Sequence, residues 1–163
     1  MASGLVSLAP TRFERVLGVL TLVLLGFVVT AVAKGSASWA KLPWELWLHL
    51  ATMALVLGLT PVILWMRRGT FRHRVMGYIW VTSLAVTALI SFRLRFNPDG
   101  GFSPIHLLSV FTLVMLVPLV LSARRHQHAK HRSAVRGLCI GALLIAGFFT
   151  FPFNRLLGSW LFS

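Results

Sequence analysis

The chain contains very few acidic residues. Of its 163 residues, 3 are Asp or Glu and 16 are Lys or Arg, which gives a net charge of +13. Glu14, Glu45 and Asp99 each stand near the end of an apolar run rather than deep inside one. Proton or cation transport through carboxylate relays inside a membrane is therefore disfavoured, and so is chemistry that needs paired carboxylates.

Cysteine is scarcer still. Cys139 is the only one, so no intramolecular disulfide can form. Its place in an apolar run predicts a small buried hydrophobic side chain. Histidines without carboxylates or further cysteines nearby argue against a zinc hydrolase. The sequence also has neither a phosphate-binding glycine loop nor a Ser-His-Asp arrangement.

Long apolar runs, by contrast, fill most of the chain. Hydrophobic residues make up 57% of it, and a helix needs roughly 20 apolar residues to cross the hydrocarbon core of a membrane. Runs of about this length occur at 13–33, 46–66, 74–92, 105–123 and 136–157. We therefore expect an all-α membrane protein with five transmembrane helices in a single integral membrane domain, residues 1–163.

The basic residues are concentrated in two short loops, at about 67–74 and 124–136. Because cytoplasmic loops are enriched in Lys and Arg, these loops and the N-terminus are expected in the cytoplasm and the C-terminus in the periplasm of a bacterial inner membrane. The same side chains would meet anionic lipid head groups. A nucleic acid partner is not expected, because that would need a continuous basic face on a soluble element.

Two segments of the chain, 49–74 and 106–132, repeat one pattern. Each opens on a histidine before an apolar run and closes on a His-Arg pair; these residues are His49 and His106, then His73-Arg74 and His131-Arg132. The repeat predicts a duplicated helix pair, with repeat A at about 46–92 and repeat B at about 105–157. Helices 2–5 would form a pseudo-two-fold four-helix bundle, with helix 1 outside it.

The predicted two-fold axis pairs histidines at equal depth. His49 would face His106 near the outer side of the membrane, and His73 would face His131 near the inner side. Haem iron takes two axial ligands, and a helix bundle can offer a histidine from each of two facing helices. The pattern therefore indicates a b-type cytochrome-like electron-transfer protein that binds one or two haems b through these four histidines.

Three further residues are candidate contacts of the inner haem. Arginine suits haem propionates as well as anionic lipid, which makes Arg74 and Arg132 candidates. Gly77 lies one turn after His73 and would leave room for a porphyrin face. His126 and His128 share a polar stretch with His131 and compete with it as the fourth ligand.

Four short motifs carry a resemblance to known proteins. They are WLH at 47–49, HRVMGY at 73–78, PIHLL at 104–108 and HR at 131–132. On these, the segment from about Trp44 to Arg155 resembles a family of bacterial membrane proteins of unknown function with an HRxxGY motif. The order of histidines on four successive helices is more distantly similar to the transmembrane diheme b-type cytochromes. That similarity implies the same ligand pairs, His49 with His106 and His73 with His131.

Two function classes stay open at this point. The first is electron transfer, alone or as part of a membrane oxidoreductase, with quinone or a redox partner at either face. The second is a haem-free accessory subunit, which would dock through its apolar faces to a larger membrane complex or to further copies of itself. A transporter or lipid-binding role is a third reading that the parallel repeat permits.

Overall fold

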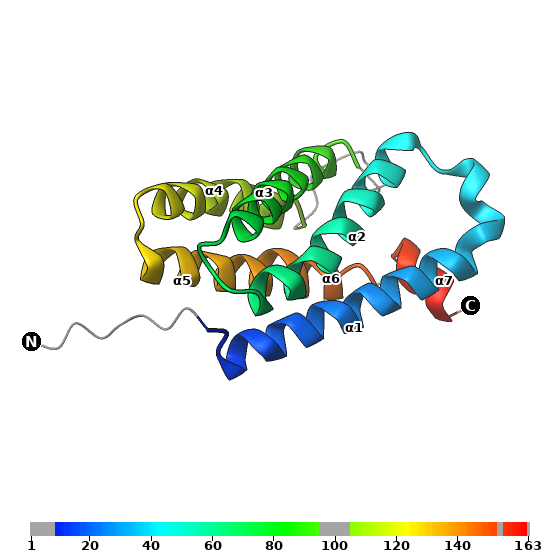
Figure 1. The fold of residues 1–163 in the computed structure, drawn as a ribbon. Helices are drawn as coiled ribbons and strands as arrows, with labels where there is room; N and C mark the ends of the chain where they lie inside the picture. The colour runs from blue at the N-terminus through cyan, green and yellow to red at the C-terminus, as the bar shows by residue number, and fades with distance from the viewer. Residues whose placement is uncertain (1–8, 95–104, 153–154, 163) are drawn as a thin grey trace, which may run out of the picture.

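The computed structural model describes residues 9–94, 105–152 and 155–162, and over these residues the chain is helical without any strand (Figure 1). The all-α prediction is confirmed. The elements in chain order are α1 (Arg12–Lys34), η1 (Gly35–Lys41), α2 (Trp44–Trp65), α3 (Phe71–Ser91), α4 (Ile105–Arg124), α5 (His128–Leu138), η2 (Cys139–Ile145), α6 (Ala146–Phe148) and α7 (Leu156–Phe162). η1 is a 3₁₀-helix and η2 is a π-helix.

Within the described residues, four helical segments are long enough and apolar enough to cross a membrane. They are Arg12–Lys41, Trp44–Trp65, Phe71–Ser91 and His106–Arg124. Their positions agree with the first four apolar runs of the sequence.

The fifth apolar run, expected at 136–157, has a different shape. α5, η2 and α6 form one uninterrupted helical stretch from residue 128 to 148, so this helix begins and ends about eight residues earlier than expected. Pro152 follows closely, and proline does not continue a helix. α7 is a separate short helix after this turn. The π-helical part packs closely on α4, since a Cβ on Gly141 would lie 2.6 Å from the Phe111 ring.

The helices pack in a closed ring. α1 contacts α2, α2 contacts α3, α3 contacts α4, and α4 contacts both α5 and η2. The ring closes because η2 also contacts α1, which in addition packs against α7. α1 is therefore a full member of the bundle, although the sequence analysis placed it outside a four-helix bundle.

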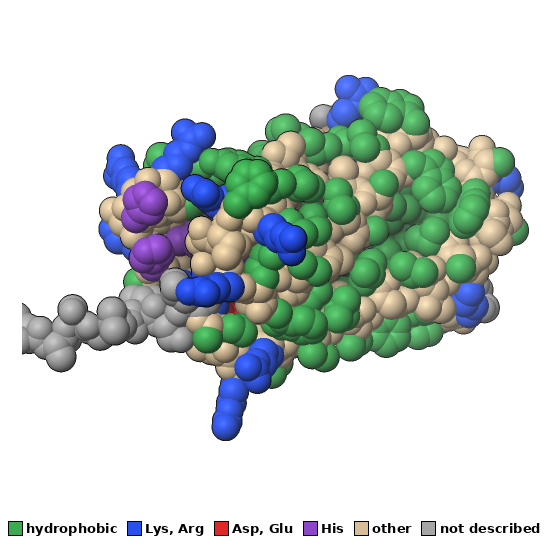
Figure 2. All heavy atoms as spheres, in the orientation of Figure 1, with side chains coloured by type: hydrophobic (Ala, Val, Ile, Leu, Met, Phe, Trp, Pro, Cys, Tyr) green, Lys and Arg blue, Asp and Glu red, His purple; other side chains and the backbone are tan. Residues whose placement is uncertain are grey.

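Large apolar side chains remain exposed along the outer faces of the helices. On α1 and α4 they recur every three or four residues: Val16, Leu20, Val23 and Phe27, then Leu107, Val110, Val114, Val117 and Leu121. Figure 2 shows apolar side chains over the middle of the molecule. A soluble monomer rarely exposes so continuous an apolar surface, and these faces suit contact with membrane lipid.

Basic side chains collect at one end of the bundle, which we call the basic end. Here α1 begins, the α2–α3 and α4–α5 loops turn, and α5 begins (Figures 1 and 2). The residues of this end are Arg12, Arg15, Arg67, Arg68, Arg72, Arg74, Arg124, Arg125, Lys130, Arg132 and Arg136. Both predicted basic loops therefore lie together with the start of α1.

Candidate functional site

A cavity of about 320 Å³ opens between α2, α3, α4 and α5 at the basic end. We call it the inner cavity. Its volume lies at the lower end of the range of ligand cavities, roughly 300–1,000 Å³. The polar and titratable residues that line it are Thr60, His73, Arg74, Tyr78, Arg124, His126 and His131. Apolar side chains form most of the remaining wall, among them Leu64, Trp80, Val81, Leu119 and Val135.

Local turn chemistry places His73 at this cavity. Gly69 has a φ of 78°, in the left-handed region that glycine adopts without a steric penalty. Thr70 then caps α3, because its hydroxyl accepts the backbone N–H of His73 at 3.2 Å. His73 thus stands in the first turn of α3. Its Nδ1 is buried and has no hydrogen-bond partner among the described residues.

A second tight turn places His131. α4 ends with two bonds of the Schellman type: Gln127 N–H donates to Ser122 O at 2.9 Å, and His126 N–H donates to Ala123 O at 3.2 Å. His126 occupies the left-handed position of this turn, with a φ of 55°. α5 starts directly afterwards and brings His131 to the cavity in its first turn.

The tautomer of His131 follows from its partner. Nδ1 lies 3.2 Å from the carbonyl oxygen of Leu119. A carbonyl can only accept, so Nδ1 carries the proton and Nε2 keeps a free lone pair. Metal-binding histidines are commonly oriented by such a bond from the other ring nitrogen.

Two more of the predicted contacts, Arg74 and Gly77, also line the inner cavity. A Cβ built on Gly77 would meet nothing within 4 Å, so open space lies beside this glycine. Arg124 lines the same cavity. His126 lines it as well, whereas His128 does not, so of the two competitors only His126 shares the cavity with His131.

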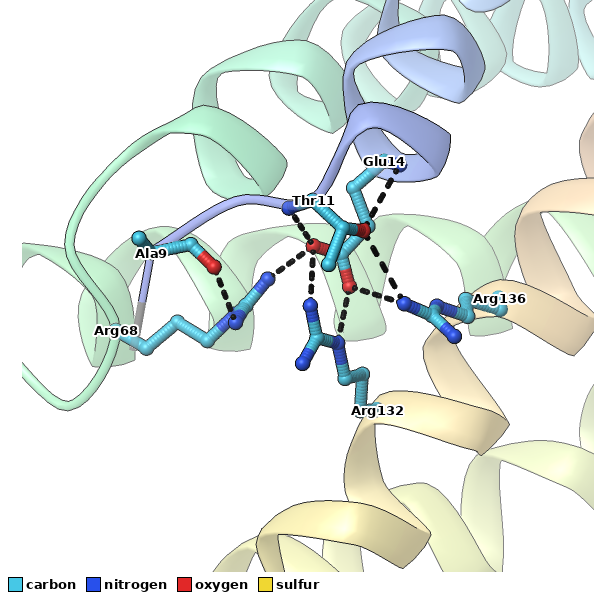
Figure 3. Close-up of polar contacts among 6 residues, drawn as sticks. All are labelled: Ala9, Thr11, Glu14, Arg68, Arg132 and Arg136. Carbon is cyan, nitrogen blue, oxygen red and sulfur yellow. Dashed lines mark hydrogen bonds and ion pairs between the residues drawn. The ribbon is translucent and has the colours of Figure 1, made fainter. Parts of the chain in front are cut away.

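Arg132 is not part of the lining, because it pairs with Glu14 instead (Figure 3). Its Nε donates to Glu14 Oε1 at 2.5 Å and its Nη2 to Oε2 at 3.0 Å. Arg68 donates to Oε2 and Arg136 donates to Oε1 at 3.2 Å. Glu14 is only 1% exposed, and we call these four residues the Glu14 cluster.

The sequence pattern did not predict a role for Glu14, although one signal was present. Thr11 and Glu14 form a capping box at the start of α1: Thr11 N–H donates to Glu14 Oε2 at 2.9 Å, and Glu14 N–H donates to the Thr11 hydroxyl at 3.4 Å. The spacing of these two residues marks a helix start. It contains no information about the three arginines, which come from the α2–α3 loop and from α5.

The outer histidine pair is arranged differently. His49 lines a smaller cavity of about 80 Å³, together with Thr87, Ser91 and Ser109. The Ser91 hydroxyl donates to the carbonyl of Thr87 at 2.8 Å, so it accepts from His49 Nδ1 at 3.3 Å and leaves His49 Nε2 as an acceptor. His106 is not among the residues that line this cavity. It is buried and stacks on Phe92, with ring centroids 5.9 Å apart.

The residues of the inner cavity fit a haem group by three observations. Two histidines from different helices share the cavity, and one of them has its Nε2 free by the argument above. Two histidines suit an iron whose other ligands come from a macrocycle. Arginines at the rim and open space beside Gly77 complete the match.

Comparisons with protein-family models, curated proteins and solved structures give no match. Function must therefore be inferred from the geometry of the two cavities and the Glu14 cluster.

Proposed function

We propose that this protein is a membrane electron-transfer protein, similar to b-type cytochromes, that binds haem b in the inner cavity. His73 and His131 would be the axial ligands. The observation that carries the proposal is their convergence: they come from α3 and α5 and line one cavity of about 320 Å³. Bound haem would supply a one-electron couple.

The surrounding side chains have separate roles in this proposal. Leu119 fixes the ring of His131 through its carbonyl oxygen. Arg74 and Arg124 are positioned to neutralise propionates at the rim of the cavity. Gly77 keeps space open on the α3 side, and the apolar wall excludes water and lowers the local dielectric constant.

The proposal also includes a second haem between His49 and His106, but the geometry supports this site less well. The outer cavity, about 80 Å³, is much smaller than known ligand cavities of roughly 300 Å³ and above. A macrocycle would enter there only if α2, α3 and α4 moved apart. The inner site is therefore the first haem site, and the electron would be exchanged with quinone or a redox partner.

The proposal includes a membrane arrangement. Residues 128–148 would be the fifth crossing, and the pairs α2–α3 and α4–α5 would be the duplicated unit. The basic end would face the cytoplasm of a bacterial cell and the C-terminus the periplasm, because basic loops favour the cytoplasmic side. Support comes from the grouping of both basic loops with the start of α1.

An absorption spectrum of the purified full chain tests the function directly. After expression with ample haem, the protein is measured oxidised and dithionite-reduced, and haem is quantified against protein. We expect the sharp reduced bands of a low-spin b haem at about one haem per chain. A colourless protein would contradict the proposal and would favour the haem-free accessory subunit, which should instead co-purify with a fixed partner complex.

Single-histidine variants then locate the site. His73→Ala and His131→Ala should each abolish or strongly reduce bound haem. His128→Ala is the matched control, because His128 lies on the same polar stretch but outside the cavity lining, and it should keep the full haem content. His49→Ala and His106→Ala should lower the haem content only if a second haem is bound.

A further inference from the structure

The Glu14 cluster is connected to the inner cavity through two of its arginines. Arg132 directly follows His131 on α5, so its bidentate bond to Glu14 holds the helical turn that carries this histidine. Arg68 lies in the short loop between α2 and α3, directly before the first turn of α3 that carries His73.

Glu14 balances part of this positive charge. The carboxylate is almost fully buried and bonds Arg68, Arg132 and Arg136 at once (Figure 3). Charge–charge interactions strengthen where the local dielectric constant is low. Removal of this one negative charge would therefore leave Arg132, the neighbour of His131 in the chain, and Arg68, in the loop before His73, without their counter-charge.

We infer that Glu14 is a positioning residue of the inner cavity, one that holds Arg68 and Arg132 in place and sets the electrostatic potential at the His73–His131 pair. This inference rests on the proposed function, because its consequence is the reduction potential of a haem bound there. Extra positive potential stabilises the reduced form, which carries one positive charge fewer. Loss of the carboxylate should therefore raise the midpoint potential.

The test is redox titration of the purified holoprotein, followed by its absorption bands. The variants are Glu14→Gln, Arg68→Gln and the double variant that combines both. Glu45→Gln is the matched control, since Glu45 also pairs with an arginine, Arg93 at 3.6 Å, but outside the Glu14 cluster and without lining the inner cavity. Haem content is measured first for every protein.

We expect Glu14→Gln to shift the midpoint potential upwards and Arg68→Gln to shift it downwards, with the double variant close to wild type. A general loosening of the structure would not give shifts of opposite sign that cancel. The inference is overturned if Glu14→Gln shifts the potential no more than Glu45→Gln does. If Glu14→Gln alone does not accumulate, the double variant decides: a potential equal to that of Arg68→Gln alone overturns the inference.

Different results would refute the proposed function and the inference about Glu14. A wild-type protein without haem removes the proposed function, and the inference with it. A wild-type protein with haem whose potential does not respond to Glu14 removes the inference alone.

Discussion

At the scale of single residues, hydrogen bonds decide what each histidine can do. His131 and His49 both use Nδ1 as a donor, to a carbonyl in one case and to a serine hydroxyl in the other. Both therefore present Nε2 as a lone-pair donor. The cavities differ in size, however, and only the inner one is lined by more than one histidine.

The buried carboxylate of Glu14 gives a first prediction, about stability. Glu14→Ala should destabilise the fold by about 3–5 kcal/mol, because it leaves three arginines at a poorly solvated site without their counter-charge. Thermal or denaturant unfolding in detergent measures the change. Glu45→Ala is the comparison: its partner Arg93 is mostly exposed, and exposed pairs contribute about 0–1 kcal/mol. Equal losses for both variants would contradict the prediction.

The open space beside Gly77 gives a second prediction, about binding. Gly77→Leu should fill part of the inner cavity and lower haem content with little loss of stability, since a Cβ there meets no atom within 4 Å. Gly26→Leu is a matched control, because a Cβ on Gly26 also meets nothing within 4 Å but Gly26 does not line the cavity. Haem-to-protein ratio is the measurement, and unchanged haem in Gly77→Leu would refute the prediction.

At the scale of elements, helix ends place the site. Thr11 and Thr70 cap α1 and α3 through their side chains, and His126 turns the chain between α4 and α5. These short-range signals explain why α3 and α5 each present a histidine in the first turn. They also explain why the fifth helix starts at His128: the turn closes there, although the residues that follow are polar.

The turn at His126 carries a third prediction. His126→Gly should stabilise the protein by about 1 kcal/mol, because a side chain in the left-handed conformation costs about 1–2 kcal/mol that glycine avoids. The haem content should not fall, and this result would exclude His126 as the ligand in place of His131. His128→Gly, within α5, should bring no such gain. The measurement is the unfolding midpoint together with the absorption spectrum, and a loss of haem in His126→Gly would point to His126 as the ligand.

The sequence predicted the positions of the helices along the chain better than it predicted which helices and side chains lie next to one another. Apolar runs located α1 to α4 within a few residues, and the repeated His-Arg pairs pointed to His73, His131 and Arg74, which do share a cavity. The place of α1 in the ring could not be predicted, because apolar periodicity does not say which helix is the neighbour. Arg132 was assigned to the cofactor because a guanidinium suits haem propionates, but its side chain binds an acid 118 residues away in the sequence.

At the scale of the whole molecule, one end is basic and the flanks are apolar, which leads to a fourth prediction. A single cysteine placed at Lys41, at the opposite end, should react with a membrane-impermeant maleimide in intact cells, and one placed at Arg125 should react only after the membrane is opened. Native Cys139 is buried, so it should not react with the maleimide in either variant. The reverse labelling pattern would invert the proposed orientation.

The long sequence separation within the Glu14 cluster has a consequence for how the protein is made. α1 is synthesised before the helices that supply its partners. Glu14 can pair with Arg68 only after the α2–α3 loop is made, and with Arg132 and Arg136 only after α5 is made. Until α5 emerges, the first helix lacks most of its charge partners. A nascent chain that stops short of α5 would therefore keep Glu14 with only one of its three arginine partners, a defect by which membrane proteases could recognise an unfinished protein.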